Sequence, residues 1–331
     1  MAAFGTVFMP KMALATFENN SWTPSSIVPS DKLEFHPGAH VLHYSSTCFE
    51  GLKAFKHDDG SVNIFRMDAN IQRMAQSGEL LSLPEINKDQ LAQMIKDSVA
   101  LYADDVPSPP GSMYIRPTHV GTEPAIGKAA APSESSALYV LLSPVGDYFS
   151  GGAGALRLLL EEDGMRCAPH MGMIKSGGNY ASALGPIIQA RKACKADQIL
   201  FCPNGDVQET GAANFILIDG NEIITKALDS TFLHGITRDS ILTIARDAGM
   251  TVTERDFTVS ELLERAKKPG TEAALSGTAA VLTPVGTLIH NGQEFPVGSG
   301  EPGETTLKLR QALNDIQWGK AEDKYGWLEK I

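Results

Sequence analysis

A lysine with no charged neighbour is the strongest chemical signal in the chain. Lys175 lies in the segment MGMIKSGGNY, between apolar residues and glycines, and glycine lets the backbone approach a ligand closely. Desolvation disfavours the ammonium form of a lysine in such surroundings, and the neutral amine can attack a carbonyl to form a Schiff base. From this segment alone, a surface lysine that follows an apolar strand is an equally good interpretation.

Two further features could serve the same reaction. In GITRDSIL, Thr237 is placed to cap a helix whose backbone amides would attract an anion such as phosphate. In ETGAANFILI, Glu209 precedes a buried strand, where its carboxylate could hold a heterocyclic nitrogen in the protonated form. Helix starts are common and acids at strand ends are usually solvated, so each signal is weak alone. Together with a Schiff-base lysine, they are the parts that a pyridoxal phosphate enzyme requires.

Three histidines could form a metal site, but the residues between them argue against it. His36, His40 and His43 have a spacing that a helix could bring to one face, but Pro37 and Gly38 interrupt such a helix. In a strand, His40 and His43 would point to opposite faces. We expect histidines that make structural hydrogen bonds, and no metal.

Other motifs are equally weak. The glycine-rich stretch 151–156 lacks the third glycine of a dinucleotide fingerprint and fits a linker better. The chain has no GxSxG motif, which leaves a serine hydrolase unsupported. Its four cysteines have no CxxC spacing, which argues against a disulfide framework and a zinc site.

Length and charge exclude several classes of partner. A chain of 331 residues favours two packed domains. With 28 basic and 39 acidic residues, its net charge of -11 would repel nucleic acid and anionic lipid. The apolar run at 137–142 is far shorter than the roughly 20 residues of a spanning helix, and the N-terminus does not resemble a signal peptide. We therefore expect a cytoplasmic protein that binds neither nucleic acid nor membranes.

Hydrophobic periodicity predicts the elements that must position these residues. A loop followed by a strand is expected over 36–55, and the other predicted strands are 112–121, 136–146, 156–162, 198–202 and 215–225. The predicted helices are 67–81, 87–105, 180–196, 237–249 and 258–268. This mixture predicts an α/β or mixed α+β architecture, with an N-terminal domain over 1–146, a linker over 147–155 and a C-terminal domain over 156–331.

The chain resembles the class IV aminotransferases, which are fold-type IV pyridoxal phosphate enzymes, and among them most closely the branched-chain amino acid aminotransferases. Nine ordered motifs from about His36 to Trp327 carry the resemblance: HVLHYSSTCFEGLKAF, FRMDANIQRM, MYIRPTHVGTEPAIG, LLSPVGDYF, KSGGNYASAL, ETGAANFI, GITRDSIL, SGTAAVLTPV and DIQWGKAEDKYGW. It implies a smaller N-terminal α/β domain and a larger C-terminal α/β domain that forms a pseudo-barrel.

The resemblance gives each candidate residue of the cofactor site a role. Lys175 would hold pyridoxal 5'-phosphate as a Schiff base and then move a proton between the substrate α-carbon and the cofactor. Glu209 would bond the pyridine nitrogen, and Tyr180 would bond the phenolic oxygen. The phosphate would be bound by the guanidinium of Arg73, by the amides of Ile236 and Thr237, and by the hydroxyl and amide of Thr278.

The substrate pocket is implied in the same way. The amides of Ala279 and Ala280 would bind the α-carboxylate, and Arg116 would bind the distal carboxylate of glutamate, the usual amino donor. An apolar pocket for leucine, isoleucine and valine would be lined by Tyr44, Phe49, Tyr114 and Tyr148. Tyr148, which lies in the predicted linker, could instead serve packing alone.

The implied reaction is a ping-pong transfer of the amino group from a branched-chain L-amino acid to a 2-oxo acid, typically 2-oxoglutarate. In the family a loop from a partner subunit covers the site, so a homodimer is the smallest assembly expected.

The chain departs from the family pattern in places that bear on substrate range. Ser45 and Ser46 stand where many relatives have glycine and glutamine, and the segment 166–175 is about one residue shorter than the common pattern. Ala280 and Thr283 stand where mammalian members have a CxxC pair. A thiol switch of that kind is therefore not expected.

Two other functions would share part of this site. A D-amino acid or (R)-amine transaminase, or an aminodeoxychorismate lyase, would keep Lys175 and Glu209 but differ in the pocket, and MYIRPTHVGTEP and CFEGLKAF favour the branched-chain group. A homologue that binds cofactor or a partner without turnover is the remaining alternative. The intact set of Lys175, Tyr180, Glu209 and Arg73 argues against it.

Overall fold

The computed structural model describes residues 4–146 and 154–331, and their contacts divide them into two compact units. The first unit contains the described residues up to 146 and the segments Ile174–Gly177 and Ile316–Ile331. The second contains the described residues from 154 to 173 and Gly178–Asp315. Lys175 and its neighbours Ile174–Gly177 thus group with the first unit, whereas the chain up to Met173 and from Gly178 groups with the second. The domain boundaries stay a prediction, because most of the predicted linker 147–155 lies outside the described residues.

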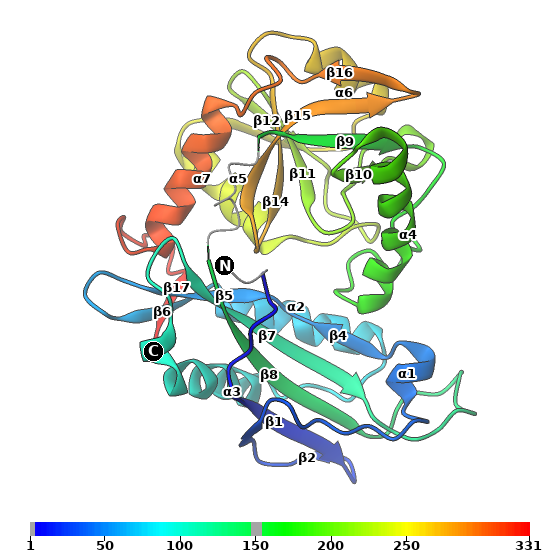
Figure 1. Cartoon of the computed structure of the whole chain (residues 1–331), viewed down its shortest axis with the longest axis vertical. Coiled ribbons are helices and arrows are strands. Elements are labelled where there is room, and N and C mark those ends of the chain that lie inside the picture. Colours follow the sequence, from blue (N-terminus) through cyan, green and yellow to red (C-terminus); the bar gives the residue numbers. More distant parts are fainter. Residues whose placement is uncertain (1–3, 147–153) are drawn as a thin grey trace. The chain divides into compact units, whose positions relative to one another are not determined.

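The first unit contains a nine-stranded sheet (Figure 1). Its strands are β1 (Lys11–Glu18), β2 (Ser21–Trp22), β3 (Ser26–Pro29), β4 (Thr47–Phe49), β5 (Leu52–Lys56), β6 (Val62–Phe65), β7 (Ser112–Gly121), β8 (Ser136–Val145) and β17 (Leu328–Lys330). The main path runs β17-β6-β5-β7-β8-β1-β2, with β3 paired to β1 and β4 paired to β7. The predicted strands over 112–121 and 136–146 are confirmed as β7 and β8.

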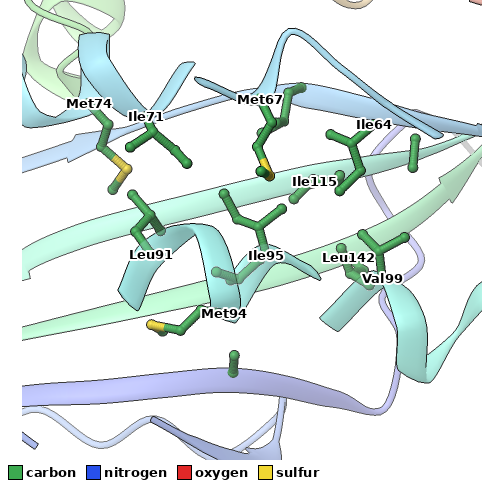
Figure 2. Close-up of a cluster of buried hydrophobic side chains, with 14 of the residues drawn as sticks. Ile64, Met67, Ile71, Met74, Leu91, Met94, Ile95, Val99, Ile115 and Leu142 are labelled. Atoms are coloured by element: carbon green, nitrogen blue, oxygen red, sulfur yellow. The ribbon is translucent and has the colours of Figure 1, made fainter. Parts of the chain in front are cut away.

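Two helices, α2 (Met67–Leu80) and α3 (Lys88–Leu101), share an apolar core with this sheet (Figure 2). The side chain of Asn87 caps α3 by accepting the amide of Gln90 at 3.0 Å. Both helices were predicted, although α3 ends before the predicted residue 105 and a short 3-10 helix, η1 (Ala103–Asp105), follows it. The core joins Ile71 and Met74 of α2, Leu91, Met94, Ile95 and Val99 of α3, and Ile115 and Leu142 of the sheet.

The segment 40–44 is a short helix, α1 (His40–Tyr44), so the expected extended conformation is wrong here. Tertiary hydrogen bonds outweigh the local β propensity. The His40 ring bonds the Ser46 hydroxyl through Nδ1 at 2.9 Å and donates from Nε2 to two backbone carbonyls, of Lys128 and Ala131. No three His, Cys, Asp or Glu side chains of residues 4–146 and 154–331 gather as metal ligands.

The second unit contains an eight-stranded mixed sheet (Figure 1). Its strands are β9 (Leu156–Glu161), β10 (Gln198–Phe201), β11 (Asn214–Asp219), β12 (Glu222–Thr225), β13 (Thr251–Glu254), β14 (Glu272–Gly277), β15 (Val281–His290) and β16 (Gln293–Pro296). The main path runs β10-β9-β15-β14-β11-β12-β13, and β16 pairs with β15. The strand predicted over 215–225 is two strands, because Gly220 takes a φ of 62° in the turn between them.

The remaining helices are α4 (Gly177–Cys194), α5 (Ile236–Asp247), α6 (Val259–Ala266), α7 (Glu304–Gln317) and the 3-10 helix η2 (Pro203–Gly205). The side chain of Thr258 caps α6 by accepting the amide of Glu261 at 3.2 Å. α4 packs Ala183 and Ala190 against Ile199 and Phe201. None of the described helices is long and apolar enough to cross a membrane.

His119 of β7 is a fully buried histidine in the first unit. Neither ring nitrogen has a hydrogen-bond partner among the described residues. Burial lowers the pKa of His119 from 6.5 to about 4, because the protonated ring would lose its hydration. The folded protein therefore holds this ring neutral at pH values where the unfolded chain binds a proton.

We predict that His119 lowers the free energy of unfolding as the pH is lowered. The stability that the neutral His119 ring contributes is complete above pH 6.5 and is lost as the pH falls toward 4, because the unfolded chain binds the proton first. Between pH 7 and pH 5 the free energy of unfolding should fall by about 2 kcal/mol. His119→Leu should remove this loss in urea unfolding at the two pH values. His170→Leu, at an exposed histidine, should keep it, and an unchanged pH dependence in His119→Leu would contradict the prediction.

Candidate active site

The first-unit residues of the site surround an interruption in one strand. β4 pairs with β7 up to Phe49 and β5 resumes the pairing at Leu52, so Glu50 and Gly51 leave the ladder although no residue is inserted. Opposite them lies Pro117, which has no N–H to donate. The Glu50 amide still donates to the Pro117 carbonyl at 2.9 Å. The missing donor on β7 thus accounts for the interruption.

The interruption places Glu50 beside Arg73 of α2. Glu50 Oε1 accepts from Arg73 Nε at 2.6 Å, and Oε2 accepts from Nη2 at 2.7 Å. Both side chains are buried, with exposures of 9% for Arg73 and 1% for Glu50. Such a two-point contact fixes the guanidinium plane and directs Nη1 away from the carboxylate. The sequence predicted Arg73 as a site residue but missed Glu50, whose only signal was its place in the CFEGLKAF motif.

Phe49 brings Lys175 and Arg116 to one aromatic ring. Lys175 Nζ lies 5.3 Å from the centre of the Phe49 ring, and the Arg116 guanidinium carbon lies 4.4 Å from it. The Lys175 amide donates to the Ser77 hydroxyl at 3.1 Å, and its carbonyl accepts the Phe49 amide at 3.0 Å. Ser77 lies one helical turn after Arg73 on α2 and is a second residue that the sequence missed. Three predicted residues, Phe49, Lys175 and Arg116, are thus brought together.

Arg116 lies close to a second ring, that of Tyr114. Its guanidinium carbon lies 5.2 Å from the Tyr114 ring centre, and Nη2 donates to the Tyr114 hydroxyl at 2.7 Å. A Cβ at Gly51 would collide with that hydroxyl, so glycine is needed there. Within residues 4–146 and 154–331, no carboxylate pairs with Arg116, and its buried Nε has no acceptor. A guanidinium beside two rings and without a counter-ion is suited to bind a carboxylate.

The structure does not group Tyr44, another predicted pocket residue, with this cluster. Tyr44 ends α1, where its hydroxyl donates to the Ile126 carbonyl and its ring lies 4.8 Å from that of His40. Those contacts join Tyr44 to the loop between β7 and β8. Tyr148 lies outside the described residues. The pocket roles of both tyrosines stay predictions.

In the second unit, Glu209 is buried, accepts hydrogen bonds from Leu233 and Asn214, and forms an ion pair with Arg166. Its Oε1 lies 2.8 Å from Arg166 Nη1 and accepts from the Leu233 amide at 2.9 Å. Its Oε2 accepts from Asn214 Nδ2 at 3.0 Å. Donors favour the ionised carboxylate. The sequence identified Glu209 but none of these partners, because they come from three separate segments.

Tyr180 lies in the first turn of α4 and contacts the same arginine. The guanidinium carbon of Arg166 lies 5.6 Å from the centre of the Tyr180 ring. Glu209 and Tyr180, both predicted as cofactor residues, are thus connected through Arg166.

The predicted helix start is confirmed, but Thr237 is not its cap. α5 begins at Ile236, with Gly235 at the N-cap position and no side chain capping the first turn. A Cβ at residue 235 would collide with the Asn214 side chain, so a side-chain cap cannot be accommodated there. Thr237 lies inside the first turn and is 8% exposed. A buried first turn with no side-chain cap leaves backbone amides suited to an anion.

Thr278, Ala279 and Ala280 form the turn that joins β14 to β15. Val281, which follows them, has a φ of 59°, a strained conformation for a β-branched residue. Such strain is common where a turn must present its backbone in one way. The predicted roles of these residues stay predictions.

The segment before Lys175 is held tightly within the second unit. A Cβ at Gly172 would collide with the backbone of Thr231, and the Met173 amide donates to the Ser230 carbonyl at 3.3 Å. Glycine is therefore required at position 172 in this shortened segment.

Comparisons with known proteins agree on one family. The profile of the class IV aminotransferases matches residues 47–288. A probable branched-chain-amino-acid aminotransferase of Streptomyces coelicolor is 38% identical, over 99% of this chain and 92% of that protein. Branched-chain-amino-acid aminotransferase 2 of Bacillus subtilis is 34% identical over the same shares.

Solved structures of one further relative agree with this match. A T.th. branched-chain amino acid aminotransferase, solved with pyridoxamine 5'-phosphate, is 26% identical with a TM-score of 0.79, over 96% of this chain and 97% of that chain. The same protein has been solved as a complex with N-(5'-phosphopyridoxyl)-L-glutamate, with a TM-score of 0.78.

We predict that Glu50→Gln destabilises the cofactor-free protein by about 3 kcal/mol, because it removes the charge of the carboxylate that accepts two hydrogen bonds from the buried Arg73 guanidinium. Urea unfolding measures this loss. Adding Arg73→Gln should recover part of it, since the buried positive charge is then removed as well. Glu304→Gln removes an exposed ion pair with Lys308 and should leave stability unchanged. Strictly additive losses at Glu50 and Arg73 would sink the prediction.

Proposed function

The chain belongs to the class IV aminotransferase family, and from this membership and its site residues we propose that it transfers amino groups between branched-chain L-amino acids and 2-oxoglutarate. The products are branched-chain 2-oxo acids and L-glutamate, and the amino acids are leucine, isoleucine and valine. The observation that carries this proposal is the ring of Phe49, which the Lys175 amine and the Arg116 guanidinium both approach. An amine for covalent chemistry thus lies near a cation that has no carboxylate partner within residues 4–146 and 154–331.

The residues present fit pyridoxal 5'-phosphate, the cofactor of the family. When bound, this group supplies a carbonyl that an amine can attack and a ring that accepts the electrons released at the α-carbon. Glu209 is a buried carboxylate suited to a protonated ring nitrogen, and Tyr180 can bond the phenolic oxygen. Arg73 and the first turn of α5, where Ile236 and Thr237 lie, are suited to the phosphate, together with Thr278.

The polar residues of the proposed site have stated tasks. Lys175 would hold the cofactor through its amine, and this amine would take the α-proton of the substrate and deliver it to the cofactor. Ser77 and Phe49 fix the Lys175 backbone, so the amine works from a defined position. The amides of Ala279 and Ala280 bind the substrate α-carboxylate.

The two substrate types need different contacts. The rings of Phe49 and Tyr114 give an apolar wall for the leucine side chain, to which Tyr44 and Tyr148 would add. Arg116 binds the distal carboxylate of glutamate, and the T.th. relative has been solved with a glutamate adduct of the cofactor. We also propose that the protein acts as a homodimer in the cytoplasm. An exposed Ile126, at 66%, on the loop between β7 and β8 is an apolar side chain that a partner subunit could cover.

We predict that borohydride fixes the cofactor covalently to Lys175, and that the tryptic peptide containing Lys175 carries the added mass. Lys175→Ala should bind the cofactor without such a bond and lose transamination by at least about 10⁴-fold, as expected when the residue that forms the covalent bond is removed. A reducible bond to another lysine in Lys175→Ala would show that the assignment is wrong.

A screen of half-reactions tests the substrate class. The absorbance of the bound cofactor should change with L-leucine, L-valine and L-glutamate, and not with D-alanine or an (R)-arylamine. A response to the last two alone would favour a D-amino acid or (R)-amine transaminase. No response at all would favour a binding protein without turnover.

We predict that Arg116→Gln separates the two substrates. Losing the charged partner of the distal carboxylate should lower kcat/KM for L-glutamate about 100-fold, whereas kcat/KM for L-leucine should change by less than about threefold, because leucine has no such carboxylate. Stopped-flow half-reactions measure both in one variant. Equal losses for the two amino acids would refute the role of Arg116.

A further inference from the structure

We infer that Arg166 is a positioning residue that keeps Glu209 ionised and in place for the ring nitrogen of the cofactor, an inference that rests on the proposed function. Arg166 lies nine residues before Lys175 and carries no role in the sequence pattern. Its side chain is 2% exposed, so the guanidinium was removed from water when the second unit folded. A charge buried this completely must be compensated by fixed partners.

The partners of Arg166 hold its guanidinium in one plane. Nη1 lies 2.8 Å from Glu209 Oε1 and 3.4 Å from the Gly172 carbonyl, and Nε donates to the Gly211 carbonyl at 3.3 Å. The Arg166 backbone is fixed as well, because its carbonyl accepts the hydroxyl of Ser182 on α4. The arginine therefore connects Glu209 to α4 and to the segment that leads to Lys175.

Arg166 differs in charge from Asn214 and the Leu233 amide, which donate hydrogen bonds to Glu209. Asn214 and the Leu233 amide contribute neutral dipoles, whereas Arg166 contributes a full positive charge. A buried carboxylate that loses its counter-ion takes up a proton instead of staying charged. A protonated Glu209 would present a donor to the ring nitrogen in place of an acceptor. The charge of Arg166 thus decides which form of Glu209 meets the cofactor.

The same guanidinium also faces Tyr180, whose ring centre lies 5.6 Å from it. Glu209 and Tyr180 are the residues proposed to bond the nitrogen and the phenolic oxygen of the cofactor ring. One buried cation contacting both gives a physical reason why these two bonds would change together.

Arg166→Met and Arg166→Lys test the inference in the holoenzyme. Arg166→Met should weaken pyridoxal phosphate binding by roughly ten- to a hundredfold, the factor for one hydrogen bond to a charged group. It should also move the pH midpoint of the bound cofactor's absorbance, and Arg166→Lys should restore most of both. Arg246→Met, at an arginine that pairs with Glu254 at 46% exposure, is the control and should change neither. An unmoved midpoint in Arg166→Met, with no rescue by lysine, would overturn the inference.

A second measurement uses cofactor-free protein. It therefore tests the inference about Arg166 separately from the proposed function. The infrared spectrum of Arg166→Met at pH 7 should contain a protonated-carboxyl band that wild type lacks and that Arg166→Met/Glu209→Gln loses. Absence of that band would contradict the inference even if Lys175 binds the cofactor as proposed. If Arg166→Met does not fold, recovery of folding in the double variant supports the pairing, and failure of both variants to fold refutes it.

Discussion

The interruption of one strand at Glu50 and Gly51 is the constraint on which the first-unit half of the site depends. Pro117 on the neighbouring strand has no amide hydrogen, so the ladder cannot continue there. The pairing register is the same on both sides of the interruption, so the side-chain positions still alternate between the two faces. Phe49 meets Lys175 and Arg116, and Gly51 leaves room for the Tyr114 hydroxyl, whereas Glu50 pairs with Arg73.

Buried ion pairs fix the positions of two charged side chains of the site. The chain as a whole carries a net charge of -11. Two charged groups proposed to meet the cofactor each have a buried partner of opposite charge: Arg73 pairs with Glu50, and Glu209 pairs with Arg166. Such pairs add little net stability, but breaking one is costly, so they fix geometry before any ligand binds. Arg116 is different, since it has no carboxylate partner among the described residues. The lack of a fixed partner suits the proposed role of Arg116, because glutamate has a distal carboxylate and the branched-chain amino acids have none.

Several elements follow from local pattern, and others do not. The helices α2 and α3 were predictable because their apolar residues repeat on one face. The strands β7 and β8 are buried on both faces and were predictable from their apolar and β-branched residues. The helix over 40–44 was not, because the hydrogen bonds of His40 to Lys128 and Ala131 come from a distant loop. Residue type predicts Thr237 as the helix cap, because threonine is a favoured N-cap residue. Its place inside the helix is set by Asn214, which fills the space that a side chain at Gly235 would need.

The sequence alone determined the chemistry of this protein: the isolated Lys175, the acid Glu209 and the order of nine motifs identify the family, because residue types and their spacing are properties of the chain. Only the tertiary structure decided which groups pair. Glu50 and Arg73 are 23 residues apart, and Lys175 and Ser77 are 98 residues apart. No periodicity spans such separations, and a buried charge accepts whichever partner the packed backbone brings within hydrogen-bond distance.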